Sequence, residues 1–523
     1  ADLAILSAAA VTVPVYPTSS SPQVSYVLGH AGCRVCFVDG MEQLSKVLLH
    51  RDDLPALERV VVLGSASGLD HSALLLTLDD LRSGGIGVVA VRDRTSALTD
   101  DDLATLVYTS GTTGPPKGTM LTHGNISWTL ASVESMLELQ PSDRMLSYLP
   151  LSHIAERMTS HFGQIAAGGE TWFARSLATV PDDLRACRPT IFLAVPRVWQ
   201  KLHDAVLDQL GASPVHLAGV LDHAATADDR PADRSPLGSL ADRAGVLAIR
   251  QTLARVVRRK LGLDRARLLA SAAAPIHPDL LRWFQGIGLP IAEVYGQTED
   301  CGPATINPPD AIRIGSVGKP IPGLDVMAAD DGELRVRGGS VCAGYYDQPE
   351  ATAELFDDDG WLCTGDLGHV DDDGYVWITG RKKDLIINAA GKNIAPAEIE
   401  ARLTMEPLVG QAVVVGDGRK YLTAVLTLDM DAAANWAEEH GAFADIAELT
   451  RAPRLRAEIE AAVDRVNRQH APVEQIKYWR LLPEPLTVEH GELTPTFKIK
   501  RDVVQREYAD LIDEMYAERA VSA

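Results

Sequence analysis

The chain of 523 residues exceeds the roughly 250–300 residues at which a single hydrophobic core stops growing, so we expect two or more domains. Apolar residues make up 46% of it and charged residues 23%, which is typical of a soluble globular protein. The formal net charge of −22 argues against general nucleic-acid affinity and leaves any anionic ligand to local donors. No run of eighteen apolar residues occurs, which predicts no membrane-spanning helix.

Residues 1–100 alternate helical and extended patterns. Helical patterns cover residues 4–10, 22–30 and 41–50, and extended patterns cover residues 11–16, 34–39 and 59–63. This alternation predicts parallel strands joined by crossover helices. The pair Cys33 and Cys36 has the spacing of redox and zinc sites, but no second pair follows, and we interpret both as core residues.

A loop rich in glycine and hydroxyl groups follows the buried-strand pattern of residues 103–108. Glycines let the backbone approach an anion, hydroxyls donate hydrogen bonds, and Lys117 adds positive charge. The loop fails the P-loop test, because Pro116 and Gly118 stand where Gly and Ser/Thr belong. The candidate phosphate-binding residues are Ser110, Gly111, Thr112, Thr113, Gly114 and Lys117.

The run from Tyr108 to Gly118 resembles the first signature of the adenylate-forming enzymes, a family of acyl-CoA ligases, firefly luciferase and peptide-synthetase adenylation domains. The resemblance implies that this loop binds ATP. A helical pattern over residues 120–139, with Thr122 or Asn125 as N-cap, predicts a helix that presents amide donors to the ligand. The family normally has several tens of residues before the position of Ala1, so either the chain is a fragment or something else completes its first sheet.

Two segments leave alternatives open. Residues 147–153 predict a strand that ends in a turn, where a lone histidine such as His153 is usually structural. The family's Pro-Leu-x-His element implies instead that His153 lines the acyl pocket. Further on, a basic helical pattern ends in the cluster Arg258-Arg259-Lys260. A solvated helix explains this cluster, and contact with a membrane surface or with coenzyme A phosphates is a second hypothesis.

A second signature follows an extended pattern over residues 290–294, after a strand at 268–270, a small-residue turn to Pro275 and a helix at 278–284. Small residues leave room for a flat ring, an aromatic can stack on it, and a carboxylate suits a hard cation. Residues 295–299 match the family's Tyr-Gly-x-Thr-Glu. The resemblance implies that Ala273 and Ala274 flank adenine, Tyr295 stacks on it beside Gly296, Thr298 and Glu299 are catalytic, and Glu299 binds Mg²⁺.

Residues 312–380 predict short strands and turns. The acidic runs at 357–360 and 371–374 lack the spacing of EF-hands and predict hairpin turns. Between them, Asp366 closes a Thr-Gly-Asp run, where a carboxylate in a turn can accept both hydroxyls of a ribose; the family's signature implies that role. Residues 380–400 are the longest match, and imply that Arg381 contacts ribose and phosphate, Lys383 is a hinge and Gly391 lines a coenzyme A tunnel.

The rest of the chain predicts strands at 411–415 and 422–428 and an amphipathic helix at 454–469. Lys498 precedes an Ile-x-Arg run in a Thr/Pro-rich loop, and the resemblance implies that it is the catalytic lysine. Phe497, where many relatives have Gly, resembles the long-chain fatty acid branch. We therefore predict an α/β multi-domain fold: a large domain (1–382) of βαβ-type sheets with a β-rich subdomain, and a small mobile α+β domain (383–523).

The resemblance implies an AMP-forming long-chain fatty acid–CoA ligase with ATP and coenzyme A as substrates and Mg²⁺ as cofactor. A fatty acyl-AMP ligase that loads a carrier protein is one alternative, and a non-catalytic nucleotide-binding protein is another. We expect small-molecule partners and no nucleic acid, and leave the oligomeric state open. Scattered cysteines favour a cytoplasmic setting, with peripheral contact to the inner membrane face as a further hypothesis.

Overall fold

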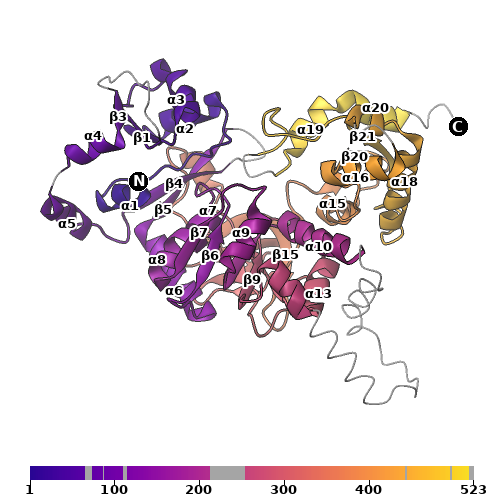
Figure 1. Ribbon diagram of the computed structural model, residues 1–523, viewed down its shortest axis with the longest axis horizontal. Coiled ribbons are helices and arrows are strands. Elements are labelled where there is room, and N and C mark those ends of the chain that lie inside the picture. The colour runs from indigo at the N-terminus through magenta and orange to yellow at the C-terminus, as the bar shows by residue number, and fades with distance from the viewer. Residues whose placement is uncertain are drawn as a thin grey trace, which may run out of the picture.

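The computed structural model describes residues 1–64, 74–85, 87–109, 115–211, 254–441, 445–494 and 498–517. In Figure 1 the indigo N-terminal elements lie at one end, the purple and magenta elements form a large central body, and the orange and yellow C-terminal elements form a smaller unit beside it. The predicted fold class, a multi-domain α/β protein with a large N-terminal and a small C-terminal part, is confirmed.

The first sheet consists of three parallel strands, as the alternating pattern predicts: β1 (Val35–Val38), β2 (Arg59–Val62) and β3 (Leu75–Thr77). The helices of this region are α1 (Asp2–Ser7), α2 (Ser21–His30), α3 (Met41–Leu48), η1 (Arg51–Asp53), α4 (Leu78–Ser83) and α5 (Val88–Ser96). The strand predicted at residues 11–16 is wrong, since only Thr12 forms a bridge, to Thr105. Pro14 and Pro17 lack the N–H that a ladder requires.

The phosphate-loop candidate connects two antiparallel strands, β4 (Leu103–Thr109) and β5 (Lys117–Thr122). The prediction of a helix over residues 120–139 is therefore wrong at its start, because residues 120–122 pair with β4. Helix α6 (His123–Leu137) begins only after Thr122, whose side chain accepts a hydrogen bond from the Asn125 N–H, as an N-cap does. The start of α6 is therefore separated from the phosphate-loop candidate by the whole of β5.

A seven-stranded sheet forms the centre of the large domain, in the order β12-β11-β10-β9-β8-β6-β7. Its strands are β6 (Arg144–Ser147), β7 (Glu170–Phe173), β8 (Ile191–Ala194), β9 (Leu268–Ser271), β10 (Ile291–Tyr295), β11 (Thr305–Ile306) and β12 (Lys319–Pro320). Helices α9 (Val180–Cys187), α10 (Pro196–Gly211) and α13 (Pro278–Gly286) share one hydrophobic core with β8 and β9, centred on Trp199 and Phe284. Near the other end of the sheet are α7 (Ile154–Glu156), the π-helix η2 (Arg157–Gly163) and α8 (Gln164–Ala167).

The parallel strands β9 and β10 run side by side, so their carboxyl ends meet at one edge of the sheet. That edge carries the small-residue turn after β9 and the Tyr-Gly-Gln-Thr-Glu run after β10. Ligands of open α/β sheets bind outside the carboxyl ends of the strands. The topology therefore places both predicted adenine-side segments where a nucleotide is expected.

The β-rich subdomain is an antiparallel sheet of β13 (Asp325–Ala328), β14 (Glu333–Arg337), β15 (Leu362–Val370) and β16 (Val376–Arg381), with α14 (Pro349–Ala353) before β15. The hairpin turns predicted at 357–360 and 371–374 are confirmed, since Asp357 and Asp371 each accept hydrogen bonds from backbone N–H groups two and four residues later. The sequence predicts Asp366 in a turn, but the residue lies within β15. This strand continues past Gly365 to pair with β16.

The small domain contains β17 (Ile386–Ile387), β18 (Asn393–Ile394), α15 (Pro396–Leu403), β19 (Val409–Val415), β20 (Leu422–Leu428), α16 (Met430–His440), α17 (Ile446–Leu449), α18 (Pro453–Asn467), β21 (Ile476–Leu481), α19 (Arg501–Glu507) and α20 (Ala509–Ala517). Every residue of β20 is buried, because helices cover both faces of its sheet. Across the described ranges, no helix is both long enough and apolar enough to cross a bilayer.

Candidate active site

Asp366 is the centre of a hydrogen-bonded group at the β15–β16 pair. Its Oδ1 accepts from Arg381 Nε at 2.7 Å, and its Oδ2 accepts from the Tyr295 hydroxyl at 2.8 Å and from Gln297 Nε2 at 3.2 Å. Asp366 is buried, whereas the Arg381 side chain is half exposed. The carboxylate is therefore fixed in direction by three donors, and Arg381 is held ready for a second anion.

Glu299 belongs to a second group, which reaches the stem of the phosphate-loop hairpin. Its Oε1 accepts from the Tyr345 hydroxyl at 2.8 Å, and the ammonium of Lys117 lies 4.7 Å from the centroid of the Tyr345 ring. Burial and the neighbouring carboxylate of Glu299 raise the pKa of Tyr345. Tyr345 therefore remains a proton donor that links the predicted metal-binding carboxylate to the predicted phosphate-binding lysine.

The loop that carries Thr298 and Glu299 is shaped by buried contacts. The Oδ1 atom of Asp300 accepts from the Gln297 N–H at 2.7 Å, and the Thr298 carbonyl accepts from the Cys301 N–H at 3.1 Å. Asp300 is fully buried, its Oδ2 has no partner within the described part of the chain, and burial raises its pKa well above the usual range. Burial thus favours the neutral form of Asp300, and the neighbouring Glu299 is the carboxylate that remains available to a cation.

Gly296 lets the start of this loop lie close to the backbone of Gly302, further along the same loop. A Cβ at this position would lie 1.6 Å from the carbonyl oxygen of Gly302, so we expect Gly296→Ala to cost about 1–3 kcal/mol or more through forced backbone displacement. Thermal unfolding measures the loss. The matched control is Gly29→Ala in α2, where a Cβ would meet its nearest atom at an ordinary 3.6 Å and helix propensity favours Ala. Equal melting temperatures for the two variants would contradict this interpretation.

Lys498 of the small domain lies within electrostatic reach of both groups. Burial and the charge of Arg381 lower the pKa of Lys498, while the carboxylates of Asp366 and Glu299 act in the opposite direction. The residue keeps accessible surface, so its desolvation is partial. Its backbone is anchored through Thr494, whose N–H donates to the Lys498 carbonyl at 2.8 Å and whose hydroxyl accepts from the Lys498 N–H at 3.0 Å.

His153 caps the short helix α7, where its Nδ1 accepts from the Ala155 N–H at 3.2 Å. Burial and the nearby charge of Lys498 lower the pKa of His153 to about 4. The imidazole is therefore neutral at pH 7, with a structural contact and a position within electrostatic reach of Lys498. This location fits both sequence interpretations of His153, the structural one and the pocket one.

The depressed pKa of His153 predicts a pH dependence of stability. The unfolded chain titrates this group near ~6.5 and the folded chain near 4, so below pH 6.5 the unfolded state binds a proton that the folded state excludes. The contribution of neutral His153 is present above pH 6.5 and is lost as the pH falls toward 4. We expect the melting-temperature difference between the wild type and His153→Asn, which keeps a capping side chain, to shift against the wild type on acidification. A constant difference from pH 7 to 4.5 would refute it.

The remaining predicted residues are spread over both domains. Ala273 and Ala274 are exposed after β9, and Ala273 adopts a left-handed conformation with φ 74°. Lys383 is exposed in the turn after β16. Gly391 has φ 76° in the β17–β18 turn, and a Cβ there would meet no atom within 4 Å. Residues 110–114, with Ser110, Gly111, Thr112, Thr113 and Gly114, lie outside the described residues.

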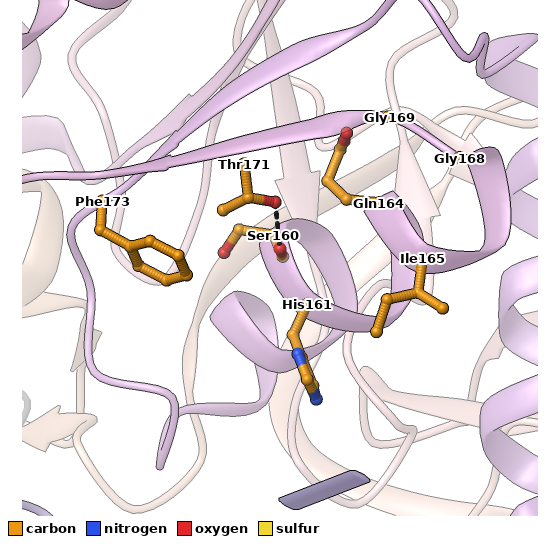
Figure 2. Close-up of a pocket in the computed structure, with 8 residues that line it drawn as sticks. All are labelled: Ser160, His161, Gln164, Ile165, Gly168, Gly169, Thr171 and Phe173. Atoms are coloured by element: carbon orange, nitrogen blue, oxygen red, sulfur yellow. Dashed lines mark hydrogen bonds between the residues drawn. The ribbon is translucent and has the colours of Figure 1, made fainter.

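A surface depression of about 390 Å³ lies elsewhere, between η2, α8 and the edge strand β7. Figure 2 shows its lining side chains and the hydrogen bond from the Thr171 hydroxyl to the Ser160 carbonyl, 2.8 Å long. The His161 ring in its wall is engaged by Asp2 at 2.9 Å. The lining includes none of the predicted site residues, so we do not assign this depression to the active site.

The described residues contain no cluster of three or more His, Cys, Asp or Glu side chains arranged to hold a metal ion. A lone carboxylate nevertheless fits Mg²⁺, which binds nucleotides through one or two carboxylates, phosphate oxygens and water. Glu299 offers such a carboxylate beside Lys117 and Tyr345. The donor set therefore suits a magnesium ion that arrives with a polyphosphate, and does not suit a structural metal.

Two residues of the site escaped the sequence analysis. Gln297 occupies the variable position of the second signature, and Tyr345 reaches the site because the neighbouring backbone pairs with β5 through a bridge between Thr119 and Tyr345. No local pattern marks Tyr345. The variable position between Gly296 and Thr298 could have suggested Gln297, since its amide can donate to a neighbouring carboxylate.

Comparison with known proteins gives a consistent result. A family model described as AMP-binding enzyme matches residues 1–346, and one described as AMP-binding enzyme C-terminal domain matches residues 383–520. The long-chain-fatty-acid–CoA ligase FadD15 of Mycobacterium bovis is 38% identical over 98% of this chain and 85% of its own length. The long-chain-fatty-acid–CoA ligase ACSBG2 of Gallus gallus is 33% identical over 99% of this chain and 72% of its own length.

A solved structure shares the fold. The A domain of carboxylic acid reductase from Segniliparus rugosus, in complex with AMP and a co-purified carboxylic acid, superposes with a TM-score of 0.71 at 22% identity. The match covers 99% of this chain and 80% of that one. At this level of identity the likeness concerns the fold alone.

Proposed function

The chain belongs to the AMP-binding enzyme family, and on this premise we propose that it is an ATP-dependent, AMP-forming long-chain fatty acid–CoA ligase. Relatives of that name cover nearly the whole chain. The observation that carries the proposal is that Lys498 lies within electrostatic reach of Asp366, Arg381 and Glu299, since this joins a cation from the small domain to a nucleotide-type site on the large one.

In the first step, a fatty carboxylate oxygen attacks the α-phosphorus of ATP, the bond to the bridging oxygen breaks, and pyrophosphate leaves. The carboxylate is already ionised at pH 7, so alignment and charge compensation are what the protein supplies. Lys498 lies between the two anions, and their charges raise its pKa again when they bind. Arg381 and Asp366 hold the ribose and its phosphate, and Lys117 with residues 110–114 holds the pyrophosphate portion.

Magnesium would be held by Glu299, with phosphate oxygens and water completing its shell. When bound, it neutralises polyphosphate charge. Thr298 directly precedes this carboxylate, and in this proposal its hydroxyl donates to the same oxygens. Tyr295 and Gly296, with Ala273 and Ala274 on the neighbouring strand end, form the adenine side of the site in this proposal.

In the second step, the coenzyme A thiolate attacks the acyl carbonyl and the bond to AMP breaks. Lys498 must withdraw so that another wall of the site faces the thiolate. We place the domain boundary at residues 382 and 383, with Lys383 as hinge of the mobile small domain and Gly391 on the coenzyme A path. The exposed turn at Lys383 and the open, left-handed position of Gly391 support these assignments.

The alternatives are less well supported. An acyl-AMP ligase that loads a carrier protein shares the first step, but the curated relatives are named CoA ligases. A non-catalytic nucleotide-binding protein does not account for the retained Lys117, Glu299, Arg381 and Lys498. We further propose a cytoplasmic setting, which six cysteines without a disulfide support, and hold peripheral membrane contact through the exposed Arg259 as a separate hypothesis.

The test is release of AMP from a mixture of ATP, Mg²⁺, palmitate and coenzyme A, with each component omitted in turn. Dependence on all four supports the ligase. Product formed with a carrier protein and not with coenzyme A would favour the acyl-AMP ligase. The absence of ATP–pyrophosphate exchange with any fatty acid between octanoate and stearate would overturn both enzymatic readings.

A further inference from the structure

Among the residues that the structure describes, two ion pairs cross from the large domain to the small one. The Arg197 guanidinium binds the Asp429 carboxylate, and Lys201 Nζ lies 3.1 Å from Asp431 Oδ2. Both cations lie one turn apart near the start of α10, and both carboxylates lie at the start of α16. Figure 1 shows α10 directly beside the orange small-domain helices α15 and α16. The pairs are therefore a local electrostatic contact between two bodies that otherwise have separate cores.

A hydrogen bond within the small domain orients the Asp429 carboxylate independently of Arg197. Its Oδ1 accepts from the Ala432 N–H at 3.0 Å and so caps α16, while Oδ2 receives Arg197. The Asp429 side chain is only 16% exposed. Exposed ion pairs contribute little because both side chains must be ordered. That cost is reduced here, since the cap has already ordered one of the two.

On the large-domain side, α10 is rigidly attached to the adenine edge of the site. It begins directly after β8, and its Trp199 is fully buried with Nε1 donating to the Ala270 carbonyl on β9. Ala270 lies three residues before Ala273. Arg197 is therefore positioned by a helix that packs on the sheet carrying the proposed nucleotide site.

On the small-domain side, hydrogen bonds and the chain itself connect the acidic pair and Lys498 to the same sheet. Asp429 follows directly on the buried strand β20. Beside that strand, Arg501 donates to the Val414 carbonyl on β19 and to Glu400 Oε2 on α15, at 2.8 Å each. Lys498 is three residues from Arg501 and is tied to Thr494. A rotation that separates Asp429 from Arg197 must therefore also move Lys498.

We propose that Arg197 and Lys201 form an electrostatic latch with Asp429 and Asp431 that positions Lys498 for adenylate formation and opens before thioester formation. The latch residues touch no substrate and act through the placement of Lys498. One apolar contact accompanies them, since Met405 of the small domain packs on the core of α10 and α13. Two charge pairs and one partly buried side chain hold the domain while keeping the contact easy to break. The proposal rests on the two-step function above.

The test compares the two half-reactions in the full chain. We expect Arg197→Gln with Lys201→Gln to slow ATP–pyrophosphate exchange about five- to tenfold, since an exposed pair contributes little but one of these two pairs is half-buried. Acyl transfer to coenzyme A from supplied acyl-adenylate should stay unchanged or rise. The matched control is Arg465→Gln, which removes a similar ion pair, to Glu406, within the small domain. Equal effects on both half-reactions, or none, would overturn the latch.

Charge reversal and rescue exclude a purely structural effect. Lys201→Asp opposes Asp431 with a like charge and should slow adenylation further, and Lys201→Asp with Asp431→Lys should restore it. Small-angle scattering supplies a readout without activity: the reversed single variant should have a larger radius of gyration than the wild type and than the swapped pair. An unchanged profile refutes the latch. If the wild type neither exchanges pyrophosphate nor releases AMP, while the reversed variant still shows the larger radius of gyration, only the function on which the latch rests is refuted.

Discussion

Replacement of Lys498 by Ala should lower ATP–pyrophosphate exchange about 100- to 1000-fold, the range found when one stabilising donor is removed from a transition state. Lys498 is the cation that the small domain brings to Asp366, Arg381 and Glu299. Without it, the attacking carboxylate and the α-phosphate repel each other with no compensating charge between them. Acyl transfer to coenzyme A from supplied acyl-adenylate should continue at close to the wild-type rate, because Lys498 is withdrawn in that step of the proposed mechanism.

The control for this experiment is Lys500→Ala, which removes the same charge two residues further along the same segment. Its exchange rate should stay within about twofold of the wild type, as expected for a surface charge. Wild-type melting temperatures for both variants would show that the loss is chemical. Loss of both half-reactions to the same extent in Lys498→Ala would mean that this lysine does not leave the site between the steps.

A second large effect is expected from Asp366→Asn. The amide can accept at one oxygen, but its NH₂ must face a donor, either the Arg381 guanidinium or the Tyr295 hydroxyl with Gln297. Loss of charge-assisted hydrogen bonds at a buried site costs about 1–3 kcal/mol, and in the proposed function the ribose loses its acceptor as well. We expect the KM for ATP to rise at least about tenfold and kcat/KM to fall about 100-fold, and the melting temperature to drop.

The same sheet offers a matched control. Asp325 and Arg337 form a cross-strand pair on β13 and β14, as Asp366 and Arg381 do on β15 and β16, but both are exposed and 3.5 Å apart. Asp325→Asn should change neither stability nor activity measurably, since exposed pairs contribute little. If Asp366→Asn lowered only the melting temperature and left the KM for ATP unchanged, the ribose-binding role would be disproved and a structural role would remain.

The local elements were largely predictable from the sequence. The strands β2, β9, β10, β19 and β20 and the helices α2, α3 and α18 follow from side-chain periodicity, because each buries one regular face or a continuous apolar run. Strand β1 follows from its run of strand-forming residues. The errors have local causes that periodicity does not register. Pro14 interrupts the segment at residues 11–16, and residues 120–122 have helical spacing but pair with β4 instead.

The candidate site was predictable only as separate motifs. The sequence determines that a hydroxyl-rich loop, Glu299, Asp366, Arg381 and Lys498 exist, since motif chemistry is written in residue types and short spacings. It does not determine which of them meet. Tyr345 reaches Glu299 through a long-range strand bridge, and Lys498 reaches the same group from a different domain.

The latch illustrates the same division. Arg197 and Asp429 are separated by 232 residues and carry no shared pattern, so only the tertiary structure, which brings the starts of α10 and α16 together, reveals the pair. Short-range sequence signals report the residues a helix or strand buries, whereas the contacts between domains depend on how whole bodies dock. The sequence by itself thus determined the family, the elements and the chemical groups of this protein. The tertiary structure alone decided the partners of those groups, because the free energy of docking is summed over surfaces that no single segment contains.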